Sequence, residues 1–145
     1  DKVQLSFVHN DLNDLSNCTK FNNLPLFRVL TNHLHGHYTF ILPASKEVPK
    51  ILKSKKNTIG LRVPDNVIAR TIVKELGHPV LSTSLPGENV EEYTDPEIIY
   101  EHFKNQVDIV INGGAGHAVP STIIDYTSGE AVMLRKGAGE WAEVG

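Results

Sequence analysis

Short apolar runs, separated by turn-forming residues, dominate the pattern of this sequence. Runs of four to six residues that glycine, proline or small polar residues bound are typical of buried strands. Pro43 closes one such run, because proline cannot donate a hydrogen bond inside a sheet. The pattern predicts strands at residues 5–8, 38–42, 58–63, 80–84, 107–111, 121–125 and 131–134.

Apolar residues at helical spacing lie between several of these strands. Asp65 precedes one such stretch, which Gly77 ends, and Asp95 opens another with Pro96 at the first helical position. Further helical segments are predicted to begin at Asp11, at Asn22 or Asn23, and over 47–53, where Val48, Ile51 and Leu52 would face inward.

Strands and helices alternate in the middle of the chain, and strands pair towards its end. This order predicts an α/β fold, with a single domain over residues 1–145 that forms a twisted mixed sheet flanked by helices. The sequence has no initiator Met, and Asp1 and Lys2 lead almost directly into a strand. We therefore interpret the chain as a piece of a longer protein.

Composition narrows the possible functions. With 145 residues and a formal net charge of -3, the chain has no overall attraction for nucleic acid, so RNA binding requires a local basic patch. Cys18 is the only cysteine, which excludes an internal disulfide and a multi-cysteine metal site and predicts a cytoplasmic protein. No apolar run approaches the roughly 18 residues that span a membrane. Hydrolase motifs such as HExxH are also absent.

Arginines and small hydroxyl residues stand at the ends of several predicted strands. In open α/β sheets ligands bind beyond strand ends, and a guanidinium there suits a carboxylate or a phosphate. A single serine at such a place is more often a cap or turn former, but several together predict one anion-binding cavity. The candidates are Arg62, Ser82, Ser84, Ser121 and Arg135.

Three other patterns have two interpretations each. The glycine-rich loop 113–116 lacks a following helix, so we favour a turn over a phosphate-binding loop. Alternating His33, His35 and His37 could form a metal site on one face, but without a nearby Cys, Asp or Glu we favour a polar loop and expect no metal. The lysine-rich segment 50–56 is either a solvated loop or a contact for RNA phosphates.

Five motifs follow one another along nearly the whole chain: residues 36–42 (GHYTFIL), 58–66 (TIGLRVPDN), 81–84 (LSTS), 120–125 (PSTIID) and 134–139 (LRKGAG). Together they resemble the YrdC-like domain family, which includes threonylcarbamoyl-AMP synthases, and within it the YciO branch. The resemblance implies a twisted α/β fold with a concave, positively charged surface.

The resemblance also implies a reaction. Synthases of this family combine ATP, with Mg²⁺, L-threonine and bicarbonate into threonylcarbamoyl-AMP and pyrophosphate for tRNA modification. Arg62 would then grip an anionic part of the substrates, Ser82 and Ser84 would face the nucleotide, Ser121 would contact the amino acid and Arg135 the phosphates. The alternative is a non-enzymatic module that binds double-stranded RNA or tRNA, with Lys53, Lys55 and Lys56 as contacts.

The chain departs from the synthase pattern at its start, at residues 82–84 and at Asn66. It begins downstream of the family's Lys-x-Arg motif, so we expect this stretch alone to be inactive in synthesis, and an unpaired sheet edge would favour a homo-oligomer. Where synthases have Ser-Ala-Asn, this chain has Ser82-Thr83-Ser84, and Asn66 stands where many have a His.

Overall fold

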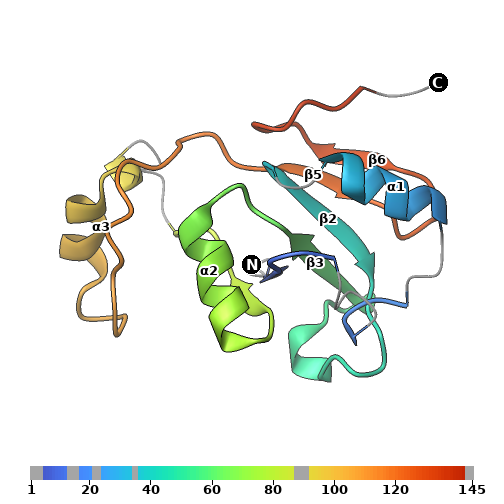
Figure 1. Cartoon of the computed structure of the whole chain (residues 1–145), viewed down its shortest axis with the longest axis horizontal. Helices are drawn as coiled ribbons and strands as arrows, with labels where there is room; N and C mark the ends of the chain where they lie inside the picture. The colour runs from blue at the N-terminus through green and yellow to red at the C-terminus, as the bar shows by residue number, and fades with distance from the viewer. Residues whose placement is uncertain (1–4, 13–16, 21–23, 34–35, 87–91, 143–145) are drawn as a thin grey trace. The chain divides into compact units, whose positions relative to one another are not determined.

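The computed structural model describes residues 5–12, 17–20, 24–33, 36–86 and 92–142 (Figure 1). These residues form two compact units, one from residues 1–83 with 121–145 and the other from residues 84–120. No described helix is long and apolar enough to cross a membrane.

The first unit contains a six-stranded mixed sheet with the order β4-β1-β3-β2-β5-β6. β1 is parallel to β3 and β2 is parallel to β5, whereas the other neighbouring pairs are antiparallel. The strands are β1 (Ser6–Val8), β2 (Tyr38–Pro43), β3 (Thr58–Arg62), β4 (Val80–Ser82), β5 (Thr122–Asp125) and β6 (Val132–Arg135). The predicted mixed α/β sheet is therefore confirmed.

Two α-helices belong to this unit, α1 (Leu24–His33) and α2 (Val67–Leu76), with the short 3-10 helix η2 (Lys50–Leu52). Asn66 caps α2, since its side-chain oxygen accepts from the Ala69 amide at 3.0 Å. The prediction that Asp65 is the cap was wrong by one residue, because only Asn66 has its oxygen within reach of that free amide. Gly77 ends α2 as predicted, with a φ of 77°.

The second unit contains η3 (Glu92–Thr94) and α3 (Pro96–Phe103). Asp95 caps α3 as predicted, by accepting from the Glu97 amide at 2.9 Å. The predicted strand at 107–111 is absent, because no described residue pairs with that segment and a strand requires a partner. The helical turn predicted from Asp11 extends into residues 13–15, which lie outside the described residues, as does the proposed start of α1 at 22 or 23.

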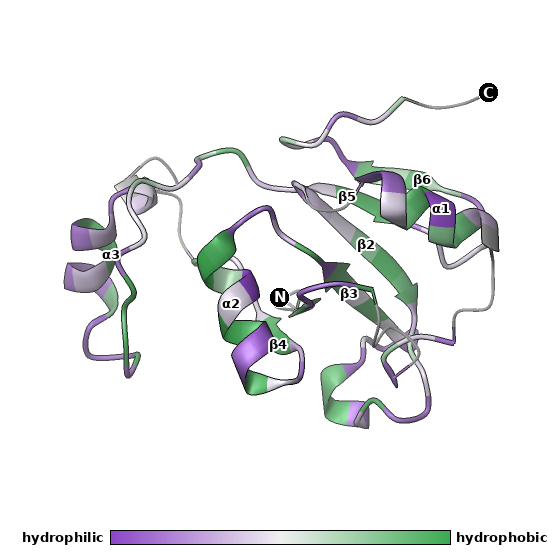
Figure 2. Cartoon of the chain, viewed as in Figure 1, coloured by the Kyte–Doolittle hydropathy of each residue, from purple (hydrophilic) through white to green (hydrophobic). Residues whose placement is uncertain are grey.

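The core of the first unit lies between α1 and one face of the sheet. Its fully buried members are shared among four elements: Leu26 and Leu30 of α1 pack with Phe40, Leu42, Leu61 and Ile124. Figure 2 shows hydrophobic residues on α1 and on the central strands. Val48 is buried in a second cluster, as predicted, but Ile51 is 88% exposed, because η2 is a single turn that buries none of its own residues.

Candidate anion-binding site

Polar side chains meet at one edge of the sheet, where strands begin or end: three come from β2, β3 and β6, and the fourth is Ser121, directly before β5. Phe40 pairs with Leu61, so Thr39 and Arg62 lie one residue nearer the same edge. The parallel register of β2 with β5 brings Ser121 there, and β6 ends at that edge with Arg135. We name Thr39, Arg62, Ser121 and Arg135 the arginine edge.

These four side chains also share a face. Side chains alternate between the two faces of a strand, and Phe40, Leu61 and Ile124 occupy the core face. Thr39 and Arg62 therefore project from the other face. Arg135 pairs with Ile123 and projects with it. The arginine edge is thus a polar patch on the sheet face that α1 does not cover.

Hydrogen bonds fix part of this patch. The Thr39 and Ser121 hydroxyls are 2.7 Å apart. Arg135 donates to the Ser121 carbonyl oxygen from Nε at 3.1 Å and from Nη2 at 2.8 Å, and Nη2 also reaches the Ser121 hydroxyl at 3.3 Å. These bonds orient the Arg135 guanidinium and leave its Nη1 without a protein acceptor among the described residues.

Arg62 is a partly buried cation whose hydrogen-bond donors are not all used by the described residues. Its Nε is buried and has no hydrogen-bond partner in the described part of the chain. Burial lowers the pKa of Arg62, and the like charge of Arg135 lowers it further. Among the described residues the ion pair joins Lys104 to Glu101 of the second unit. Neither Arg62 nor Arg135 therefore forms an ion pair with a described carboxylate. Two neighbouring cations without an ion-pair partner among the described residues suit an anion with several oxygens.

Thr122 positions the segment that follows Arg135. This fully buried residue donates from Oγ1 to the Gly139 carbonyl at 2.6 Å and accepts from the Gly137 amide at 2.9 Å. The Tyr38 hydroxyl donates to the Glu140 carbonyl at 2.6 Å. The chain beyond β6 is therefore tied back to β2 and β5.

Sequence reasoning missed two polar residues. The apolar pattern identifies Thr39 only as part of a strand, although its place beside Phe40 puts it on the face opposite the core. Arg70 of α2 also has a buried Nε without a described acceptor. Its signal in the sequence is weak, because an arginine one turn into an amphipathic helix resembles a solvated residue.

The other two predicted site residues are Ser82 and Ser84. Ser82 pairs with Ser6, whereas Val80 pairs with Val8, the partner of Arg62. The antiparallel direction of β4 therefore leads Ser82 away from the arginine edge. Ser84 is exposed and begins the second unit. Within the first unit the structure thus brings Arg62, Ser121 and Arg135 together, and Ser82 does not join them.

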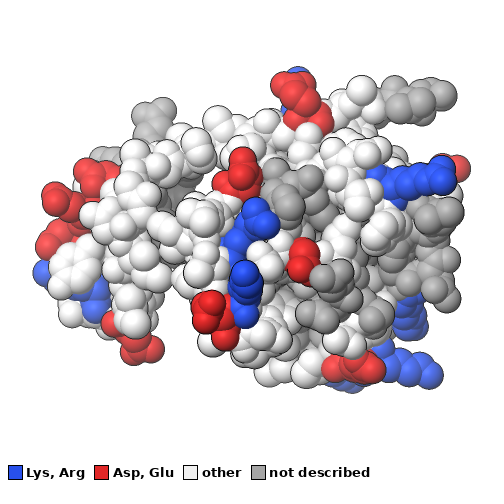
Figure 3. All heavy atoms as spheres, in the orientation of Figure 1, with Lys and Arg blue, Asp and Glu red and all other residues white. Residues whose placement is uncertain are grey.

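The predicted RNA contacts occupy the opposite end of the sheet. Pro43 pairs with Thr58 at that end, and Lys53, Lys55 and Lys56 lie in the connection between β2 and β3. Lys55 and Lys56 are exposed. In Figure 3 basic atoms project from the lower right, where Figure 1 draws this connection.

The histidine pattern does not form the extended array that a metal site on one face would need. His33 is the last residue of α1, where its Nδ1 lies 2.7 Å from the Val29 carbonyl and its ring contacts Tyr38 and Trp141. His35 lies outside the described residues. The described chain holds no cluster of three His, Cys, Asp or Glu residues that could bind a metal.

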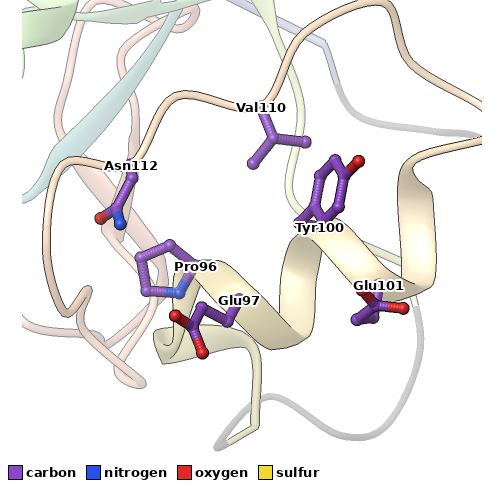
Figure 4. Close-up of a pocket in the computed structure, with 6 residues that line it drawn as sticks. All are labelled: Pro96, Glu97, Tyr100, Glu101, Val110 and Asn112. Carbon is purple, nitrogen blue, oxygen red and sulfur yellow. The ribbon is translucent and has the colours of Figure 1, made fainter.

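The second unit has a pocket of its own, of about 400 Å³ (Figure 4). It lies between α3 and the segment that follows it, and its lining residues are Pro96, Glu97, Tyr100, Glu101, Val110 and Asn112. The predicted glycine turn follows this segment: Gly114 has a φ of 88°, and its amide donates to Asn112 Oδ1 at 3.0 Å.

Comparison with known proteins places this fold in a family. The family model of Sua5, YciO and YrdC proteins, described as "Telomere recombination", matches residues 1–137 and so includes residues of both units. The chain belongs to the Sua5/YciO/YrdC family. The resemblance predicted from the five motifs is therefore confirmed.

Two relatives in the Sua5/YciO/YrdC family are 44% identical to the chain. One is an uncharacterized protein of Haemophilus influenzae, matched over 140 residues (94% of this chain, 67% of the relative). The other is the uncharacterized protein YciO of Escherichia coli K12, matched over 143 residues (97% and 68%). A threonylcarbamoyl-AMP synthase of Pyrococcus abyssi is 29% identical over 103 residues (70% and 30%).

Solved structures of the family agree with the fold. The crystal structure of Escherichia coli YciO matches with a TM-score of 0.86 and 42% identity, over 94% of this chain and 67% of that one. Pyrococcus abyssi Sua5, solved in complex with L-threonine, matches with a TM-score of 0.79 and 23% identity, over 93% and 40%. At that identity the second match shows the fold alone.

Proposed function

We propose that the arginine edge binds ATP and that the protein carries out the chemistry of threonylcarbamoyl-AMP synthases. The observation that carries this proposal is the pair of arginines without a carboxylate partner among the described residues, one of which has a buried nitrogen that lacks an acceptor there. The similarity to threonylcarbamoyl-AMP synthases of Pyrococcus abyssi and Coxiella burnetii, at 29% and 30% identity, supports it.

The proposed reaction joins L-threonine, bicarbonate and ATP. The threonine amine and bicarbonate give a carbamate with loss of water, a carbamate oxygen attacks the α-phosphorus, and pyrophosphate leaves. Such a reaction depends on orientation and on neutralised charge rather than on a covalent protein nucleophile. Arg62 and Arg135 would neutralise the phosphates, and Ser121 would lie towards the amino acid. Ser82 and Ser84 would face the nucleotide away from the phosphates that Arg62 and Arg135 hold.

Magnesium would arrive with the nucleotide. Mg²⁺ is commonly held by one or two carboxylates together with substrate phosphates rather than by a cage of protein ligands. The described residues offer no cluster of acidic and histidine ligands, which fits an ion carried by ATP. The chemistry that it would supply is further neutralisation of the phosphate charge.

Pyrophosphate release that depends on threonine and bicarbonate tests the proposal, and it is measured on a protein that also carries the family's Lys-x-Arg motif, because we expect residues 1–145 alone to be inactive in synthesis. Arg62→Ala should slow release by about 10²-fold or more, because it removes a charge aimed at the reacting phosphates. Arg28→Ala is the matched control, since Arg28 is exposed on α1. An unchanged rate in Arg62→Ala would remove Arg62 from the site. ATP binding without any release by the unaltered protein would limit the function to nucleotide binding.

A second candidate function is binding of double-stranded RNA or tRNA. The observation that favours it is the group of lysines in the connection between β2 and β3, of which Lys55 and Lys56 are exposed and Lys53 is half-buried, and none of which forms an ion pair with a described carboxylate. Neutralising Lys53, Lys55 and Lys56 should bring the negative slope of log K against log salt closer to zero, by roughly 0.9 for each RNA phosphate that a lysine no longer neutralises. Arg62→Ala should leave this slope unchanged. RNA affinity that does not fall as the salt concentration rises would contradict this second function.

A further inference from the structure

The antiparallel strands β5 and β6 (Figure 1) shift their register by one residue. Ile124 pairs with Met133, whereas the next pair joins Ile123 to Arg135. Leu134 therefore lies opposite no residue of its own. One extra residue on one strand of an antiparallel pair is a β-bulge, and bulges beside functional sites re-aim the side chains that follow them. This bulge directly precedes one of the two arginines of the arginine edge.

The bulge decides which face of the sheet Arg135 occupies. In a regular ladder Ile123 would pair with Leu134, and Arg135 would lie opposite Thr122. Cross-strand neighbours project to the same face, and Thr122 is fully buried on the core face. Arg135 would then project towards the core. With the bulge it projects with Ile123 instead, and its guanidinium reaches the Ser121 carbonyl at 2.8 Å.

The hydroxyl of Thr122 holds the shifted register. Its Oγ1 accepts from the Gly137 amide at 2.9 Å and donates to the Gly139 carbonyl at 2.6 Å. Gly137 follows Arg135 by two residues, so the first bond fixes how far β6 advances along β5. A return to the regular ladder would move Gly137 by one residue along β5, about 3.4 Å, and break this bond. The register that turns Arg135 outwards and the bonds of Thr122 therefore occur together.

We propose that Thr122 is a positioning residue for the arginine edge: it locks the bulge at Leu134 and so turns Arg135 towards the phosphates of ATP. The ligand in this inference rests on the proposed function, whereas the register is a property of the chain itself. A guanidinium that the fold already orients loses less freedom when an anion binds, which raises affinity. Thr122 faces the core, so it acts through Arg135.

Calorimetric titration of the full chain with ATP at low salt measures the effect. Thr122→Val keeps the shape of the side chain and removes the hydroxyl, so we expect ATP to bind about tenfold more weakly. Thr122→Ser keeps the hydroxyl and should bind like the unaltered chain. Val48→Ala removes buried apolar atoms from the second core cluster and controls for a loss of stability alone, so its ATP affinity should not change.

Deletion of Leu134 separates position from stability. Without this residue a regular ladder pairs Ile123 with Arg135, so the register no longer needs the lock. In the Thr122→Val background the deletion should therefore restore most of the lost ATP affinity, although it returns neither hydrogen bond. Fluorescence of Trp141, which packs against the core of the first unit, shows that each variant is folded. A double variant that binds as weakly as Thr122→Val would overturn the inference, as would unchanged affinity in Thr122→Val.

A second readout needs no ATP. The Arg135 Nε–H donates to the Ser121 carbonyl at 3.1 Å, and nuclear magnetic resonance follows its exchange with water. Exchange should be severalfold faster in Thr122→Val and unchanged in Val48→Ala. Equal exchange in Thr122→Val and the unaltered chain would overturn the inference. Faster exchange in Thr122→Val, together with no ATP binding by the unaltered chain, would support the positioning role and overturn the proposed ligand.

Discussion

Replacing Thr122 with valine tests how the fold holds the chain beyond Arg135. Valine has nearly the shape of threonine but lacks the hydroxyl that donates to the Gly139 carbonyl and accepts from the Gly137 amide. Thr122 and Gly139 are buried and Gly137 is half-buried, so water cannot fully replace the lost bonds. An unsatisfied buried polar group costs about 1–3 kcal/mol. The buried Gly139 carbonyl would cost about 1–3 kcal/mol and the half-buried Gly137 amide about 1 kcal/mol. We therefore expect a loss of about 2–4 kcal/mol in the free energy of unfolding.

Thr122→Ser is the matched control, because it keeps the hydroxyl and removes one methyl group. Its expected cost is about 1 kcal/mol, from the lost apolar burial. Urea unfolding followed by fluorescence measures both, since the single tryptophan, Trp141, packs against Phe40 in the core of the first unit. The reasoning is refuted if Thr122→Val is no less stable than Thr122→Ser.

Three further predictions concern stability. Gly139→Ala would place its Cβ 2.5 Å from Tyr38 Cε1, so we expect the free energy of unfolding to fall by about 1–3 kcal/mol. In a double-mutant cycle Tyr38→Leu should reduce this loss, and additive effects of the two substitutions would contradict the clash. Asn66→Ala should lower the free energy of unfolding by about 1 kcal/mol and Asp65→Ala should hardly change it, because only Asn66 accepts from the Ala69 amide. A larger loss in Asp65→Ala than in Asn66→Ala, measured by thermal unfolding, would identify Asp65 as the cap instead. Val48→Ala should cost about 1–3 kcal/mol and Ile51→Ala little, given that Val48 is 5% exposed and Ile51 88%; equal losses on urea unfolding would refute the described packing.

The sequence predicts the central strands correctly, because their apolar residues pack against α1 in the core. The strands around Phe40, Leu61 and Ile124 lie where their apolar runs predict, because each run is buried against α1. The strand predicted at 107–111 fails for the complementary reason: its apolar residues have strand propensity, but the described chain offers them no partner. Similarly, Asp65 and Asn66 are both good capping residues, and only the path of the backbone decides between them.

The candidate site was predicted in part. Arg62, Ser121 and Arg135 meet because the strands that carry them end or begin at one edge. Ser82 does not join them, since the direction of a three-residue strand such as β4 follows from its pairing with β1 and not from its own composition. The unpaired Nε of Arg70 could not be foreseen, because burial of one atom in a helix depends on tertiary packing.

The central claim is that the arginine edge binds the phosphates of ATP, and calorimetric titration with ATP at low salt tests it most directly. We predict saturable binding by the chain, loss of that binding in Arg62→Ala and an unchanged isotherm in Arg28→Ala. Absence of binding by the unaltered chain, or equal affinity in Arg62→Ala, would contradict the claim that these two guanidiniums form an ATP site.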